Sequence, residues 1–127
     1  MSGHVLELLL GEAIRSGASQ ISIDPHRGRI RVQLLVNGKW IDCTTLPEDS
    51  WEQLLEAIKR RSGIDPSSTS WPQHGEIRRQ NSALPVTITR ARKRETVLIE
   101  IPPGAAGTQG PSETSRTSAG NRTRFWT

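Results

Sequence analysis

Apolar residues near the N-terminus recur with the spacing of a helix. Leu6, Leu9, Leu10 and Ala13 lie three or four positions apart, which places them on one helical face. Gly17 follows, and glycine readily adopts the left-handed backbone conformation that ends many helices. The pattern predicts an amphipathic helix that ends at Gly17 and packs its apolar stripe against a core.

After Gly17 the apolar positions alternate with polar ones, which is typical of half-buried strands. Ile21 and Ile23 share one side of a strand predicted over 20–24. Because proline lacks the backbone N–H that a sheet requires, Pro25 is expected to end this strand. The chain therefore passes directly from a helix into a sheet.

The next segment has the pattern of a β-hairpin. Apolar and polar residues alternate over 30–36, and a return strand is predicted over 39–46. Asn37-Gly38 lies between them, and this pair favours the tight turns in which both residues have positive φ. Three antiparallel strands are therefore predicted after the first helix.

A second helix is predicted after residue 50, with Leu54 and Ile58 on its buried face and Gly63 beyond its end. Ser50 followed by Gln53 predicts a capping box at its start. Three further strands are expected over 76–80, 84–92 and 96–101. The predicted fold class is α/β (α+β), with two helices packed on a curved antiparallel sheet of five or six strands in the order α-β-β-β-α-β-β-β.

Composition divides the chain into two parts. Only 33% of the residues are hydrophobic, so part of the chain is not expected to contribute to a core. From Pro102 onward, proline, glycine, serine and threonine dominate without any period. A folded domain is predicted over 1–102 and a disordered tail over 103–127.

Charge and cysteine content exclude several classes of protein. The 14 basic and 12 acidic residues before Pro102 leave a net charge of +2 there, too small by itself to indicate a nucleic-acid-binding protein. The lone Cys43 rules out an internal disulfide, and the three histidines lack the spacing of a metal site. No apolar run reaches membrane-spanning length. We expect a cytoplasmic protein without cofactor, metal or membrane insertion.

Residues 17–25 read Gly-Ala-Ser-Gln-Ile-Ser-Ile-Asp-Pro. This resembles the Gly-Ala-Ser-Asp-Ile-His-Ile-Glu-Pro signature in the domain that precedes the motor of type II secretion and type IV pilus assembly ATPases. The hairpin over 30–40, Leu46-Pro47, Pro72-Gln73-His74-Gly75 and the strand over 95–101 resemble further family segments in the same order. The resemblance covers about residues 8–101 and implies a PAS-like layout of this N-terminal domain.

The departures from the family pattern concern nucleotide chemistry. Family arginines that reach towards nucleotide correspond here to Thr69, Ser70, Glu76 and Pro85, none of which is basic. The motif Gly-x-x-x-x-Gly-Lys-Ser/Thr, which cradles phosphates, would begin shortly after Ile101 in the family and is absent here. We therefore expect no ATP hydrolysis by this chain alone and predict no catalytic residues.

One group of basic residues remains as a candidate partner-binding surface. It comprises Arg78, Arg79, Arg90, Arg92, Lys93 and Arg94. The simplest interpretation is a solvated hairpin tip whose charges discourage edge aggregation. The functional alternatives are a surface for an acidic protein partner or for nucleic acid. The aromatic residues that favour single-strand binding do not alternate with these arginines.

The function predicted from these observations is that of a non-catalytic, stand-alone domain for docking or assembly in a secretion or pilus system. Its expected partner is another component of the apparatus or a second copy of the chain. Two alternatives to this prediction stay open at this point. The first is a small basic nucleic-acid-binding module, and the second is the remnant of a truncated ATPase with no present role.

Overall fold

The computed structural model describes residues 2–92 and 94–103, which form two α-helices, a short 3-10 helix and a sheet. The order of elements agrees with the prediction, and the 3-10 helix, η1, precedes the second α-helix. The elements are α1 (Ser2–Arg15), β1 (Gln20–His26), β2 (Arg29–Val36), β3 (Lys39–Pro47), η1 (Glu48–Ser50), α2 (Trp51–Ser62), β4 (Gln73–Arg79), β5 (Ser82–Ala91) and β6 (Arg94–Glu100). The tail predicted over 103–127 lies, from residue 104 onward, outside the described residues.

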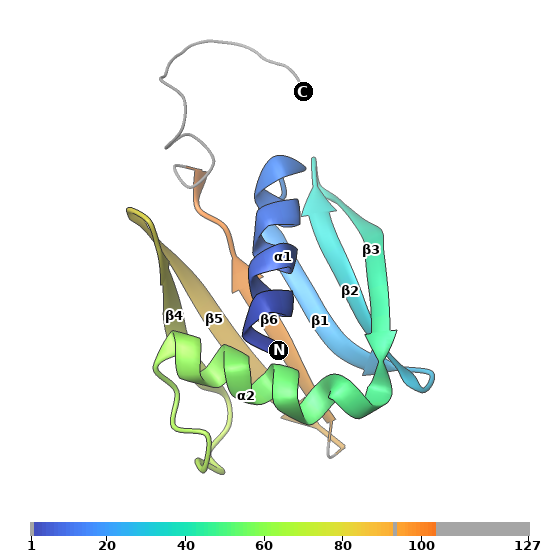
Figure 1. Ribbon diagram of the computed structural model, residues 1–127, viewed down its shortest axis with the longest axis vertical. Coiled ribbons are helices and arrows are strands. Elements are labelled where there is room, and N and C mark those ends of the chain that lie inside the picture. The colour runs from blue at the N-terminus through green and yellow to red at the C-terminus, as the bar shows by residue number, and fades with distance from the viewer. Residues whose placement is uncertain (1, 93, 104–127) are drawn as a thin grey trace, which may run out of the picture.

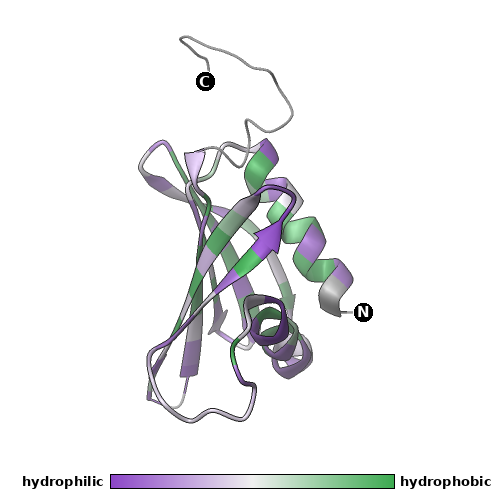
Figure 2. Ribbon diagram, turned by 90° about the vertical axis from the view of Figure 1, so that its left-hand side faces the viewer, coloured by the Kyte–Doolittle hydropathy of each residue, from purple (hydrophilic) through white to green (hydrophobic). Residues whose placement is uncertain are grey.

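The sheet consists of two three-stranded meanders joined side by side. Its strand order is β3-β2-β1-β6-β5-β4, and all neighbouring strands are antiparallel. Each meander follows one helix, and both helices cover the same face of the curved sheet (Figures 1 and 2). We call the other side, which neither helix covers, the open face. Neither described helix is long and apolar enough to cross a membrane.

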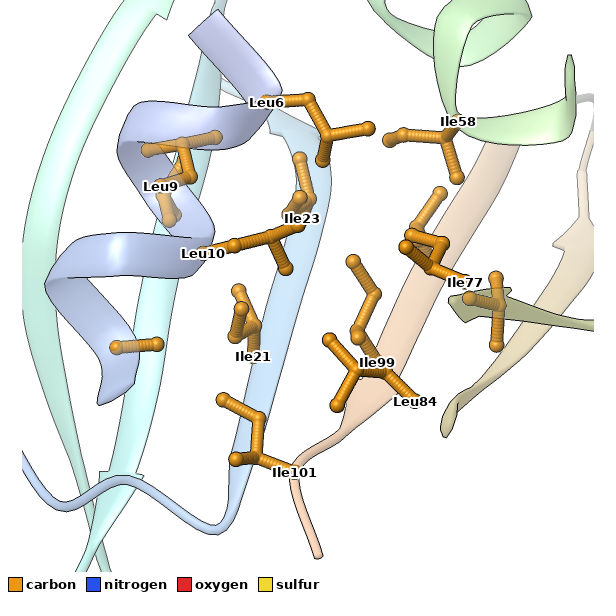
Figure 3. Close-up of a cluster of buried hydrophobic side chains, with 14 of the residues drawn as sticks. Leu6, Leu9, Leu10, Ile21, Ile23, Ile58, Ile77, Leu84, Ile99 and Ile101 are labelled. Atoms are coloured by element: carbon orange, nitrogen blue, oxygen red, sulfur yellow. The ribbon is translucent and has the colours of Figure 1, made fainter. Parts of the chain in front are cut away.

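The core lies between the helices and the sheet, as the alternation of apolar residues predicts. Isoleucines of β1, β4 and β6 meet leucines of α1 and Ile58 of α2 there (Figure 3). The apolar faces of the separate helices and strands in the sequence predict one common core of eight residues. Among these eight, Ile14 is only partly buried but packs against the core. The others are buried: Leu9, Ile23, Val32, Leu54, Ile58, Val97 and Ile99. The prediction of one common core is confirmed.

Two tight turns join the strands of the first meander. Asn37 and Gly38 have φ values of 53° and 80°, as predicted for the Asn-Gly hairpin. Arg27 and Gly28 also have positive φ values, 53° and 77°, between β1 and β2. Asparagine tolerates this conformation well, whereas arginine adopts it rarely and at a cost in free energy.

Two predictions about the ends of elements are wrong. β1 continues through Pro25 to His26, whereas the sequence predicts that it ends at Pro25. β6 pairs with β1 only over Gln20–Ile23, so at Pro25 the strand pairs with β2 alone. On its unpaired side the missing N–H of proline is tolerated, as at a sheet edge. Ser50 does not cap α2 with its side chain. Its backbone is already helical because η1 leads directly into α2.

The C-terminal end of α2 packs very closely on β4. Gly63 has a φ of 76°, and the Ile64 N–H donates to the Lys59 carbonyl at 2.8 Å, which closes the helix. A Cβ atom placed on Gly75 would collide with the carbonyl oxygen of Ser62 and with the side chain of Ile64. The absence of a side chain at Gly75 is thus what allows α2 and β4 to approach.

Candidate partner-binding surface

The structure divides the predicted basic surface between the two ends of β5. Arg78 and Arg79 precede the β4–β5 turn, where Arg79 is opposite Ser82. Arg90 and Arg94 flank the β5–β6 turn, close to the other end of this ten-residue strand. An extended strand of that length measures roughly 30 Å, so these arginines form two separate groups. Arg92 lies in the β5–β6 turn, and Lys93 lies outside the described residues.

Arg79 contributes to the fold by pairing with an acid on α1. Its Nε lies 3.4 Å from Oε1 of Glu7, and Nη1 of Arg61 lies 2.7 Å from Oε2 of the same carboxylate. Burial acts to raise the pKa of Glu7, but the hydrogen bonds and positive charges of Arg61 and Arg79 outweigh it and lower this pKa. Glu7 thereby links α1 to both α2 and β4.

The remaining arginines of the predicted set differ in their surroundings. Arg78 is highly exposed and lies 3.6 Å from the carboxylate of Glu76. Arg90 lies 3.7 Å from the carboxylate of Glu95, and its guanidinium carbon is 5.6 Å from the centre of the Trp71 ring. Arg92 and Arg94 have no ion-pair partner among the described residues, and both are exposed. These two members of the set are therefore available for an external contact, and Arg94 also borders a cleft.

Arg94 borders a cleft at the end of the sheet, which we call the turn cleft. The cleft has a volume of about 540 Å³ and lies between the β1–β2 turn, the β5–β6 end and the start of α2. Its lining residues are Pro25, His26, Arg27, Gly28, Glu48, Asp49, Trp51, Glu52, Leu55, Arg94 and Glu95. Residues from three distant parts of the sequence therefore form one concave surface.

The turn cleft combines an apolar lining with charged residues of both signs. Trp51 and Leu55 pack against the core and supply the apolar part. Arg27 and Arg94 contribute positive charge from the two strand turns. The acids of η1 and the first turn of α2 contribute negative charge, at a helix end where carboxylates are favourable: Glu48, Asp49 and Glu52. Such a surface suits a polypeptide segment that carries an apolar anchor between charged residues.

Sequence reasoning found Arg94 but missed the rest of this site. The relevant signal was the Arg27-Gly28 pair between two apolar strands, which resembles the Asn-Gly pair of the next turn in its position. The spacing of Trp51 to Leu54 and Ile58 predicts only that Trp51 belongs to the buried face of its helix. What sequence patterns did not give was the proximity of the turns to the start of α2, because that depends on how α2 crosses the sheet.

The described residues offer little for other chemistry. No group of three or more His, Cys, Asp or Glu side chains among them is placed to hold a metal ion. Burial and the nearby charge of Glu12 raise the pKa of Cys43, which disfavours a reactive thiolate.

The fold and the turn cleft together define a small α/β domain with a concave, charged surface at the end of its sheet. No family model matches the chain. Over 80 residues, 63% of its length, the chain is 26% identical to the type IV pilus assembly ATPase PilB of Thermus thermophilus. That stretch makes up 9% of PilB, so the chain spans a small fraction of this relative. The likeness is compatible with a relation to pilus assembly ATPases.

Proposed function

We propose that the chain is a non-catalytic docking module of a type IV pilus or type II secretion system. It binds a protein partner through the turn cleft. The observation that carries this proposal is the cleft itself, where Trp51 and Leu55 lie between the charges of Arg94 and Asp49. Aromatic and arginine side chains dominate the energetics of many protein interfaces when a partner covers them and excludes water.

The type of apparatus is suggested by the likeness to PilB. A pilus assembly ATPase is similar to 63% of this chain, and the Gly17–Pro25 signature resembles the same family. In this proposal the partner is another component of the assembly apparatus or a second copy of the chain. Its contacting segment carries an apolar side chain for the Trp51 surface, an acid for Arg94 and a base for the carboxylates opposite.

The non-catalytic part of the proposal rests on the sequence. The phosphate-cradling motif is absent from the 127 residues, and the family's nucleotide-directed arginines are replaced. Without the backbone N–H groups and lysine of that motif, the β- and γ-phosphates of ATP lack their usual ligands. Binding rather than hydrolysis is therefore the activity that we propose.

A photo-cross-linking residue at position 52, in the full chain and in its native host, tests this proposal. Glu52 borders the cleft and is exposed, so the substitution leaves the core intact. The matched control is position 81, where exposed Asn81 lies in the β4–β5 turn, at the other end of β5 from the cleft. We expect position 52, and not 81, to cross-link to a secretion or pilus component. Equal cross-linking from both positions, or adducts only with unrelated proteins, would contradict the proposal.

Nucleic-acid binding through the basic set predicted from the sequence, Arg78 to Arg94, is less favoured by the geometry. A phosphate-binding face requires several unpaired cations in continuity. Arg78 and Arg79 lie at the other end of β5 from Arg90 and Arg94, and carboxylates accompany three of these four. A separate salt titration, described below, distinguishes the two functions.

A further inference from the structure

A β-bulge in β3 alters which side chains face the open side of the sheet. Asp42 is opposite Gln33 and Thr44 is opposite Val32, so Cys43 has no partner on β2. In a regular strand, residues three positions apart point to opposite faces. Here Asp42 and Thr45 both lie beside open-face residues of β2, Gln33 and Arg31. Bulges of this kind often re-aim side chains next to functional sites.

The bulge borders a second concave region, which we call the bulge pocket. It has a volume of about 570 Å³. Its lining residues are His26, Arg27, Arg29, Arg31, Asp42, Cys43, Thr44 and Thr45. Three arginines and one carboxylate make this lining positively charged. The region is distinct from the turn cleft, although Arg27 and His26 border both.

Hydrogen bonds within the pocket leave part of its positive charge unpaired. Arg31 donates to both carboxylate oxygens of Asp24, at 3.3 and 3.2 Å. Asp42 accepts a hydrogen bond from the side-chain amide of Gln33 at 3.0 Å. Both carboxylates beside the pocket therefore already have a donor. Arg27 and Arg29 have no carboxylate partner among the described residues.

Arg29 is oriented so that its outer nitrogens remain available. Its Nε donates to the hydroxyl of Thr45 at 3.2 Å, which holds the guanidinium against β3. The two terminal nitrogens form the fork that arginine uses for bidentate contacts with oxyanions. This contact exists because the bulge brings Thr45 to the open face. The β-bulge in β3 therefore helps to hold the Arg29 guanidinium with its terminal nitrogens available.

Arg27 adds a second cation, from a backbone position that arginine rarely occupies. Its φ of 53° lies in the left-handed region, where asparagine or glycine is more stable. Gln80 and Arg92 have similar φ values, 56° and 54°, in other turns of the sheet, so this conformation is a property of the tight turns. What matters for binding is that the β1–β2 turn places Arg27 at the border of the pocket.

We propose that the bulge pocket binds a phosphate group, either as the free anion or as the terminal phosphate of a small ester. Arg27 and Arg29 contact its oxygens. A phosphate presents enough oxygens to engage two guanidinium forks at once, whereas a carboxylate presents only two oxygens. The Asp42 carboxylate, held by Gln33, lies at the pocket's border and disfavours anions that would approach that side. This proposal does not depend on the docking function.

Calorimetric titration of the full chain tests the proposal. The probes are inorganic phosphate, pyrophosphate and glycerol 3-phosphate, with acetate as the carboxylate control, all at constant ionic strength. We expect the phosphate probes to bind and acetate not to bind. If glycerol 3-phosphate binds as tightly as the inorganic anions, the pocket accepts a phosphate ester. If only the inorganic anions bind, the ligand is the free anion.

Variants distinguish this pocket from general surface charge. Arg29→Gln should weaken phosphate binding by about tenfold or more, since it removes a charge-assisted bidentate contact. Arg78→Gln removes the same charge from an exposed position at another part of the sheet and should leave binding unchanged. Arg27→Asn should weaken binding while raising the melting temperature, because asparagine suits the positive φ. A variant that binds phosphate more weakly but melts at a higher temperature cannot have lost binding through unfolding.

Three outcomes would overturn the proposal. The first is that the wild-type chain binds none of the phosphate probes. The second is that acetate binds as tightly as phosphate, which would indicate a carboxylate site. The third is that Arg78→Gln reduces binding as much as Arg29→Gln, which would indicate attraction by overall charge alone.

Discussion

The indole Nε1 of Trp51 lies 3.5 Å from Oε1 of Glu95, which brings the first residue of α2 next to β6. Glu95 also lies 3.7 Å from Arg90 across the β5–β6 pair. The start of α2 is thereby connected to the strand turn that carries Arg94. These contacts connect the helix that carries Trp51 and Leu55, the apolar lining of the turn cleft, to the strand that carries Arg94.

Gly75→Ala should destabilise the fold. The added Cβ would meet the backbone of Ser62, which cannot move without shifting the end of α2. Overpacking of this kind typically costs about 1–3 kcal/mol. Gly11→Ala is the matched control, because its Cβ would meet only the flexible end of Arg15 at 3.3 Å. In mid-helix that change should stabilise the protein by about 0.5–1 kcal/mol. Urea unfolding measures both, and equal effects would contradict the close approach of α2 and β4.

Acid should weaken the link that Glu7 makes between α1, α2 and β4. Arg61 and Arg79 lower the pKa of Glu7 in the folded state. Glu7 therefore stabilises the fold at pH values above its ordinary pKa of 4.5. That contribution is lost as the pH falls from there through the lower folded pKa. In Glu7→Gln, the free energy of unfolding should therefore decline less between about pH 5 and pH 3. Chemical unfolding across this range checks the prediction, and parallel curves for both proteins would contradict it.

Nucleic-acid binding should be weak and should disappear near physiological salt. If the arginines of β5 and β6 contacted phosphates, the affinity would fall with salt with a log–log slope of about −0.7 to −0.9 per contact. Fluorescence anisotropy with labelled DNA, measured against salt, tests this. Submicromolar affinity at physiological salt that is lost when Arg90, Arg92 and Arg94 are replaced by serine would favour the nucleic-acid alternative.

The isolated chain should hydrolyse no ATP and should bind no magnesium–ATP tightly. The first reason is that the phosphate-cradling motif is absent from the sequence. The second is that the positions of the family's nucleotide-directed arginines are occupied here by Thr69, Ser70, Glu76 and Pro85. A coupled phosphate-release assay and calorimetry with magnesium test this prediction. Weak, magnesium-independent binding that Arg29→Gln abolishes would belong to the bulge pocket. Micromolar, magnesium-dependent binding would contradict the prediction.

Sequence patterns predicted the fold well because most of it depends on local periodicity. Alternation around Ile23 and Val32 gave the strands, and Asn37-Gly38 gave the hairpin between β2 and β3. The predicted end of β1 at Pro25 was wrong because tolerance of proline depends on which strands lie beside it, and that is a property of the assembled sheet.

The candidate sites were less predictable because they depend on register and on distant contacts. The bulge at Cys43 decides which face Thr45 occupies, and no pattern in the sequence marks it. The cluster of basic residues suggested one surface, but Arg79 and Arg90 lie near opposite ends of β5. Sequence proximity therefore overestimated the continuity of the charge and missed the contribution of Arg27 from another turn.

The affinity of charge-reversed variants for the cross-linked partner tests the docking function most directly. Arg94→Glu alters the rim of the turn cleft, and Arg78→Glu makes the same change at the other end of the sheet. We predict that Arg94→Glu weakens binding to the secretion or pilus component by about tenfold or more, through repulsion at the interface. Arg78→Glu should leave the dissociation constant within about twofold of the wild-type value. Equal effects of the two reversals, or a loss confined to Arg78→Glu, would contradict docking through the turn cleft.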